Sequence, residues 1–223
     1  MQTSDILYED SSIIAINKPA GIMVESSPAG FSSIEQMIEA YFIDIRVSQN
    51  TIIGIAHRID RPVSGVLLIA KKRSALKDLN QQFADGKVRK TYYALTDQAP
   101  EKKEGMLEHF IGRDASAKRA VIYPKPKKGA IACSLSYKIL NETSNGVLWE
   151  IHPHTGKYHQ IRAQLAHVGA PIKGDVTYGG KIISIKDAIL LHAGKLVFTH
   201  PFTKEEMRIT ATFPTYWGVT LPE

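Results

Sequence analysis

The stretch TIIGIAHRIDRPVSGVLLIA, residues 51–70, places a charged segment between two apolar runs. The runs are Ile52-Ile53 and Val66 to Ala70, and their unbroken apolar character is typical of buried strands. Between them Asp60 stands with Arg58 on one side and Arg61 on the other. A surface ion pair would explain this arrangement, and so would a catalytic acid kept ionised beside bound phosphate.

Outward from this stretch, the pattern indicates many short strands and few helices. One helix follows Ser32 or Ser33, either of which can cap it with Glu35 or Gln36 three residues on. Two more are expected over residues 74–86 and 158–169. Strands are expected within residues 6–24 and near 88–96, 105–111, 119–123, 131–140, 146–152, 189–198 and 206–213. The sequence therefore predicts an α+β fold with a mixed, largely antiparallel central sheet and flanking helices.

Composition favours a globular protein with a polyanionic partner. The chain has 223 residues, which is within the range of one domain, and a net charge of +6. Lysine and arginine gain free energy by releasing counterions from phosphates. The basic residues cluster at 71–73, 87–90 and 118–129, although each cluster is equally explained as a solvated loop or strand edge. The single cysteine, Cys133, excludes an internal disulfide and favours a cytoplasmic setting, and no apolar run approaches the ~18 residues of a membrane helix.

Several familiar site patterns are missing from the sequence. Ser64 lacks the glycine two residues before it that a nucleophile elbow needs. No glycine-rich phosphate loop occurs, so no nucleotide cofactor is expected. Four histidines lie close in sequence but do not form the His-Glu-x-x-His pattern, and we expect no metal; they are His152, His154, His159 and His167.

Arg162 is the second charged residue of interest. In YHQIRAQLAHVG, residues 158–169, it lies near the N-terminal end of the expected helix and off the stripe formed by Ile161 and Leu165. A cation there is unfavourable unless an anion is close. Asp60 or an RNA phosphate would supply that anion, and the alternative is a plain exposed arginine.

Five segments, in order along the chain, resemble the RluA-type RNA pseudouridine synthase family. They cover most of the chain, from about residue 6 to 214, and five in order make chance agreement improbable. The segments are NKPAGIMV (17–24), HRIDRPVSG (57–65), KTYYAL (90–95), HTGKYHQIRAQLAHVGAPIKGD (154–175) and LLHAGKLVFTHP (190–201).

The resemblance implies roles for particular residues. Asp60 matches the catalytic aspartate, Arg162 the arginine that pairs with it, and Tyr92 the active-site tyrosine. Arg58 matches the arginine that helps to displace the target base from the RNA stack. The other expected substrate-binding residues are His57, Lys157, His159, Gln160 and Leu191. The family uses no cofactor and no metal, and its fold surrounds a catalytic cleft.

The chain also departs from the family pattern. In HRIDRPVSG (57–65), the aspartate segment, Ile59 replaces a leucine and Val63 a threonine. Lys157 and Tyr158 replace an arginine and a threonine in the segment 154–175. Glu25 follows Val24 where many relatives carry histidine. None of these changes removes Asp60, Tyr92 or Arg162.

The expected function is isomerisation of specific uridines to pseudouridine in transfer or ribosomal RNA. Each route for this reaction needs Asp60 ionised, and an adjacent arginine lowers a carboxyl pKa that burial would raise. The alternatives are a catalytically inactive RNA-binding protein of the same fold and a metal-dependent phosphoesterase. We expect one catalytic domain over residues 1–223 without an appended RNA-binding module. The RNA, the uridine and the oligomeric state are left open, with a monomer favoured.

Overall fold

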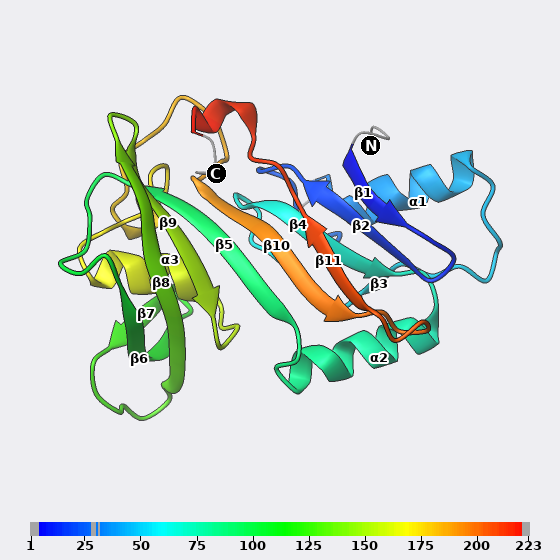
Figure 1. Ribbon diagram of the computed structural model, residues 1–223, viewed down its shortest axis with the longest axis horizontal. Helices are drawn as coiled ribbons and strands as arrows, with labels where there is room; N and C mark the ends of the chain where they lie inside the picture. Colours follow the sequence, from blue (N-terminus) through cyan, green and yellow to red (C-terminus); the bar gives the residue numbers. More distant parts are fainter. Residues whose placement is uncertain (1–4, 28–29, 31, 220–223) are drawn as a thin grey trace. The chain divides into compact units, whose positions relative to one another are not determined.

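The computed structural model describes residues 5–27, 30 and 32–219. The described residues divide into two compact units (Figure 1). The first unit comes from Met1–Lys90 and Ala193–Pro214, and the second from Thr91–His192 and Thr215–Glu223. The chain passes between the units at three points: within β5 (Arg89–Thr96), within β10 (Leu191–Thr199) and between Pro214 and Thr215.

The first unit contains a sheet with the strand order β1-β2-β4-β10. Its strands are β1 (Ile6–Glu9), β2 (Ile13–Lys18) and β4 (Ser64–Ala70), followed by β10. The short strand β3 (Gly54–Ile55) pairs with β4, and β11 (Glu206–Thr210) pairs with β10. The β1–β2, β2–β4, β3–β4 and β10–β11 pairs are all antiparallel.

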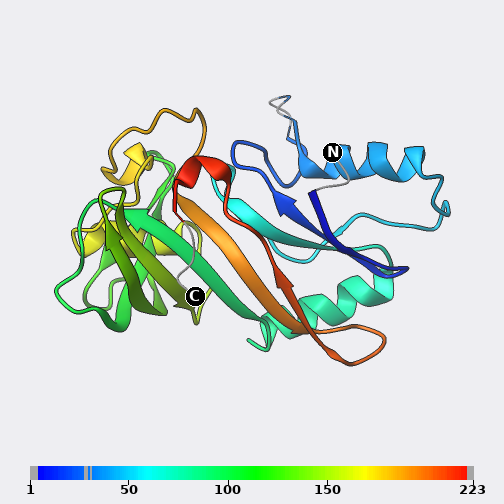
Figure 2. The same cartoon turned by 45° about the horizontal axis from the view of Figure 1, so that its top comes forward.

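Helices α1 (Ile34–Asp44) and α2 (Arg73–Ala84) cover opposite sides of this sheet (Figure 2). Ala75 and Leu79 of α2 pack in one core with side chains from one face of the sheet. Ile13 of β2 and Leu68 of β4 belong to that core. Side chains alternate between faces along a strand, so Ile14 points to the other face, and it too is fully buried. All seven residues of β4 are buried, as expected for a strand covered on both faces.

The second unit contains an antiparallel sheet with the strand order β5-β9-β8-β6-β7. The strands are β6 (Glu104–Asp114), β7 (Arg119–Tyr123), β8 (Ile131–Thr143) and β9 (Gly146–Pro153), together with β5. Helix α3 (Gln160–His167) packs on β6, β7 and the short 3-10 helix η2 (Val176–Tyr178). A second 3-10 helix, η3 (Thr215–Trp217), follows β11 in the chain.

The expected α+β fold, with a mixed and largely antiparallel sheet and flanking helices, is confirmed. Ser33 caps α1 and forms the full capping box with Gln36. The catalytic cleft that the resemblance implies stays a prediction. Among the described residues, no helix combines the length and the apolar character needed to cross a bilayer.

Several expected boundaries were wrong, among them those at Ile52-Ile53, at the start of α3 and at the end of β11. The run Ile52-Ile53 precedes a strand of only two residues at Gly54–Ile55. Helix α3 begins at Gln160 instead of residue 158, because His159 has the left-handed backbone angle φ of 51°. Strand β11 ends at Thr210 instead of residue 213.

Candidate active site

Asp60 lies on a tight turn between β3 and β4. The backbone N–H of Val63 donates to the Asp60 carbonyl at 3.0 Å and closes the turn. Ile59 and Val63 are 6% and 2% exposed, whereas Asp60 is half-buried. The two apolar side chains therefore anchor the loop in the core and leave the carboxylate at its edge. Val63 fills an apolar position, so the loop keeps its place although the threonine hydroxyl of the family pattern is missing.

Lys18, the last residue of β2, holds this turn through hydrogen bonds. Its side chain is fully buried, and its ammonium donates to the carbonyls of Pro19 (2.8 Å), Ile22 (2.9 Å) and Arg61 (3.2 Å). The Arg61 carbonyl also accepts from the backbone N–H of Gly21 at 2.8 Å. The Lys18 ammonium and the Gly21 N–H, both from the NKPAGIMV segment, therefore hold Arg61, the residue that follows Asp60.

The charge of Lys18 is coupled to Asp60. Burial lowers the pKa of Lys18 from 10.5 to about 7, while the Asp60 carboxylate favours its charged form and Arg61 opposes it. No role was predicted for Lys18 from the sequence, although it lies in NKPAGIMV, one of the five segments that resemble the family.

Gly65 allows the chain to leave the turn close to β10. Its φ is +118°, and a Cβ placed on it would lie 2.3 Å from the Ala193 carbonyl oxygen. Only glycine fits such a backbone conformation and such a close approach. The Ser-Gly ending of the aspartate segment therefore has a steric cause.

The two residues before Ile59 have different environments. His57 accepts a hydrogen bond at Nε2 from the Leu68 backbone N–H at 2.9 Å, and its ring stacks on Phe83. Burial, helped by repulsion from Lys90, lowers the pKa of His57 to about 4, so the ring is neutral at pH 7. The Arg58 side chain is 71% exposed and forms an ion pair with Glu25 at 2.7 Å.

In the second unit, Arg162 is buried and tightly paired with Asp175. Its Nε and Nη2 groups donate to the two Asp175 carboxylate oxygens at 2.6 and 2.8 Å. The side chains are 6% and 1% exposed, and the guanidinium lies 5.2 Å from the centre of the Tyr178 ring. The expectation of a plain exposed arginine was therefore wrong. A guanidinium has five N–H donors, so Asp175 engages only part of its capacity, and the pairing of Arg162 with Asp60 stays a prediction.

A chain of contacts continues from Tyr178 to the surface. Burial raises the pKa of Tyr178 to about 12, so its phenol stays protonated. The phenol accepts from the Ala120 N–H at 2.7 Å and lies 3.1 Å from His159 Nδ1, within hydrogen-bond distance. The His159 ring stacks on Tyr158, whose ring lies 4.7 Å from the Arg113 guanidinium.

The loop that holds Asp175 has its own steric requirement. Gly180 donates its N–H to the Asp175 carbonyl at 2.9 Å. A Cβ on Gly180 would lie 2.0 Å from the Ile172 carbonyl oxygen. The loop can therefore wrap around Asp175 only with glycine at this position. No role was predicted from the sequence for Asp175, Tyr178 or the Gly179-Gly180 pair.

The remaining expected site residues occupy contrasting positions. The amide of Gln160 is 4% exposed and fully engaged by Thr155, the Lys157 N–H, the Ser134 carbonyl and Gln164. Lys157 is exposed and Tyr92 is half-buried on β5, opposite Ile151. Leu191 is 3% exposed and begins β10.

The expected site residues are divided between the two units. His57, Arg58 and Asp60 belong to the first unit, and the other six belong to the second. Their functional roles stay predictions. Within the part of the chain that the structure describes, no group of three or more His, Cys, Asp or Glu residues is arranged to hold a metal ion.

Comparison with known proteins identifies the family. The RNA pseudouridylate synthase family model matches residues 12–167. The chain is 36% identical to a ribosomal large subunit pseudouridine synthase C from Buchnera aphidicola, over 96% of this chain and 68% of that protein. It is 32% identical to a tRNA pseudouridine synthase C from Vibrio parahaemolyticus, over 96% of this chain and 92% of that protein.

Solved structures agree on the fold. The human protein named RNA pseudouridylate synthase domain containing 4 has a TM-score of 0.80 at 23% identity, covering 97% of this chain and 91% of that one. The chain belongs to the RNA pseudouridylate synthase family, whose members are isomerases that act on RNA.

Proposed function

We propose that this protein isomerises uridine to pseudouridine in transfer or ribosomal RNA, with Asp60 as the catalytic carboxylate. The observation that carries the proposal is the Asp60 turn, which is clamped by the buried ammonium of Lys18 within the region matched by the family model. A carboxylate at the edge of a core, beside a buried cation, is the arrangement expected of an acid that reacts while ionised.

The reaction breaks the bond between C1′ of the ribose and N1 of uracil and joins C1′ to C5 of the same base. The target base must leave its stack to reach Asp60, which costs a few kcal/mol. Arg58 is exposed on the same loop as Asp60, in a position suited to occupy the vacated space. In this proposal Tyr92 stacks on the uracil or assists removal of the C5 proton, and Arg162 favours the ionised form of Asp60.

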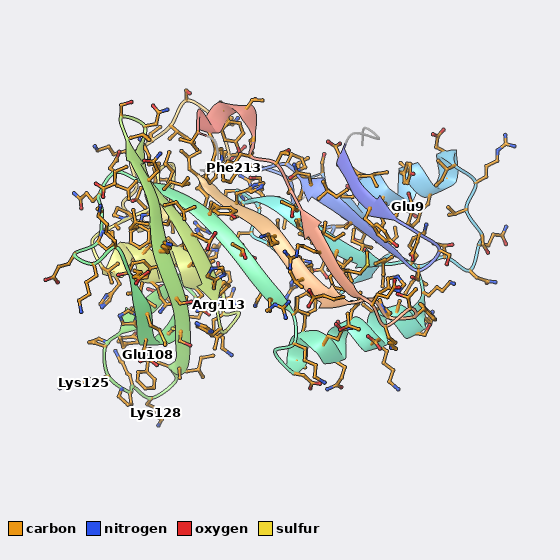
Figure 3. The ribbon with its side chains drawn as sticks, viewed as in Figure 1. Glu9, Glu108, Arg113, Lys125, Lys128 and Phe213 are labelled. Carbon is orange, nitrogen blue, oxygen red and sulfur yellow. The ribbon has the colours of Figure 1, made fainter. Side chains whose placement is uncertain are left out.

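The protein's basic surface supports RNA as the substrate. Lys125 and Lys128 lie on the loop between β7 and β8, and Arg113 lies on β6 (Figure 3). The Lys127 ammonium lies 4.2 Å from the centre of the Tyr123 ring, which places a cation beside an aromatic face. Cations bind phosphates through counterion release, and aromatic rings can stack on unpaired bases.

The relatives support both RNA classes. One is named for the large ribosomal subunit and another for tRNA, so both classes belong to the proposal. We further propose that the enzyme is cytoplasmic, which the single cysteine supports, and that it acts as a monomer.

Mapping pseudouridines in total RNA from cells with and without the gene tests the proposal. The expected result is the loss of signal at one or more discrete uridines of tRNA or rRNA, restored when the gene is returned. Identical maps in the two strains would contradict the proposed activity.

A further inference from the structure

Glu25 and Arg58 form a charge pair on the exposed side of the first unit. The Arg58 Nη1 group donates to Glu25 Oε2 at 2.7 Å, and the two side chains are 71% and 45% exposed. The residues are 33 positions apart in sequence, so the pair depends on the folded loop. A plain surface ion pair is the simplest explanation, but hydrogen bonds to the first turn of α1 hold the backbone on both sides of Glu25.

The backbone on both sides of Glu25 is fixed to the first turn of α1. The Met23 carbonyl accepts from the Ile34 N–H at 2.8 Å, and the Val24 carbonyl accepts from the Glu35 N–H at 3.1 Å. On the other side, the Ser26 N–H donates to the Glu35 carboxylate at 2.9 Å. Glu25 is therefore presented from an anchored segment.

Arg58 is presented in a similar way. The next residue, Ile59, is 6% exposed, and the preceding His57 is bonded to the backbone of β4. Two fixed backbones thus hold two exposed side chains of opposite charge face to face. An exposed pair of this kind changes an equilibrium constant by only about twofold to fivefold, so it can hold the guanidinium and still yield to a phosphate.

We propose that Glu25 is a positioning residue that holds Arg58 in the RNA-free enzyme, and that RNA must displace the Glu25 carboxylate to engage Arg58. This inference rests on the proposed function, in which Arg58 contacts the RNA. Its consequence is that Glu25 weakens RNA binding, because RNA must break the pair and the carboxylate repels nearby phosphates.

A double-mutant cycle tests the proposal. Glu25→Gln, Arg58→Gln and the double variant are compared with the wild-type protein for binding to a fluorescently labelled RNA hairpin with an all-uridine loop. Affinity is measured by anisotropy across a series of salt concentrations, starting low enough that all four proteins bind. Glu39→Gln, an exposed change of the same charge on α1, is the matched control. Thermal denaturation confirms folding, and Glu25→Ala replaces Glu25→Gln if the latter fails to fold.

The expected result is that Glu25→Gln tightens binding by about twofold to fivefold at low salt and steepens the salt dependence. This gain should vanish in the Arg58→Gln background, and Glu39→Gln should not reproduce it. An equal gain in both backgrounds would show a general charge effect and overturn the proposal, as would the absence of any gain. If the wild-type protein itself fails to bind the RNA at low salt, the proposed function is overturned together with this inference.

Discussion

Replacing Asp175 with asparagine should destabilise the protein strongly. The substitution keeps the size of the side chain but removes the negative charge that the buried Arg162 faces. One amide oxygen can still accept a single N–H, whereas the bidentate pair at 2.6 and 2.8 Å is lost. Breaking a buried pair by removing one partner costs about 3–5 kcal/mol, because the remaining charge is left uncompensated.

The loss can be converted into a melting temperature. A domain of this size loses about 2–4 °C per kcal/mol, so Asp175→Asn should melt about 6–20 °C lower than the wild-type protein. Urea denaturation gives the free energy of unfolding, and calorimetry gives the melting temperature. Asp97→Asn is the matched control in the same unit, since its partners Lys173 and Lys181 are 3.3 and 3.4 Å away and Asp97 is exposed. That control should cost less than about 1 kcal/mol.

A second variant separates the charge effect from lost packing. The double change Arg162→Met with Asp175→Leu removes both charges, so its stability should return toward that of the wild-type protein. Isomerase activity of the double variant should be lost, because Arg162 is absent. A loss below about 1 kcal/mol in Asp175→Asn, or a double variant no more stable than the single one, would refute the reasoning.

Three further predictions concern the first unit. Gly65→Ala should lower the free energy of unfolding, measured by urea denaturation, by more than about 2 kcal/mol, because the new Cβ would lie 2.3 Å from the Ala193 carbonyl oxygen. Gly86→Ala, which has open space around it, should lower it by about 1 kcal/mol. Equal losses in the two variants would contradict this prediction. The pKa of Lys18 is about 7 in the folded protein, against its ordinary value of 10.5. The unfolded state therefore binds more protons between these pH values, and stability rises with pH there. Lys18→Met should remove up to about 1.4 kcal/mol per pH unit of that slope between pH 7 and 9, and an unchanged slope would show that folding does not lower the pKa of Lys18. The pKa of His57 is about 4 in the folded protein, against its ordinary value of 6.5, so its stabilising contribution is complete above pH 6.5 and is lost as the pH falls toward 4. His57→Gln should therefore make the free energy of unfolding depend less on pH below 6.5. An unchanged pH dependence in that range would count against a buried neutral ring.

Much of the fold was predictable because local signals agreed with the tertiary structure. The apolar run of β4 predicted a strand buried on both faces, and Ser33 with Gln36 predicted the start of α1. Local signals failed where a tertiary contact decided the outcome. Helix α3 starts late because His159 adopts a left-handed conformation, and its ring lies between Tyr158 and Tyr178.

The resemblance supplied candidate site residues but not their partners. The aspartate segment pointed to Asp60 and Arg58, whose roles stay predictions, and nothing local showed that Arg162 would pair with Asp175, thirteen residues away across a loop. Helical spacing placed Arg162 off the apolar stripe and so suggested exposure. It is buried because the η2 loop covers that side of α3, which a pattern within one helix cannot reveal.

The role of Asp60 is tested most directly by one pair of measurements on the Asp60→Asn variant. Total RNA from cells that lack the gene serves as substrate, pseudouridine formation is followed over time, and RNA binding is measured in parallel. Asp44→Asn, an exposed change of the same kind at the end of α1, is the control. The account predicts that Asp60→Asn forms no pseudouridine and still binds RNA, while the control converts normally. Conversion by Asp60→Asn at the wild-type rate would contradict it.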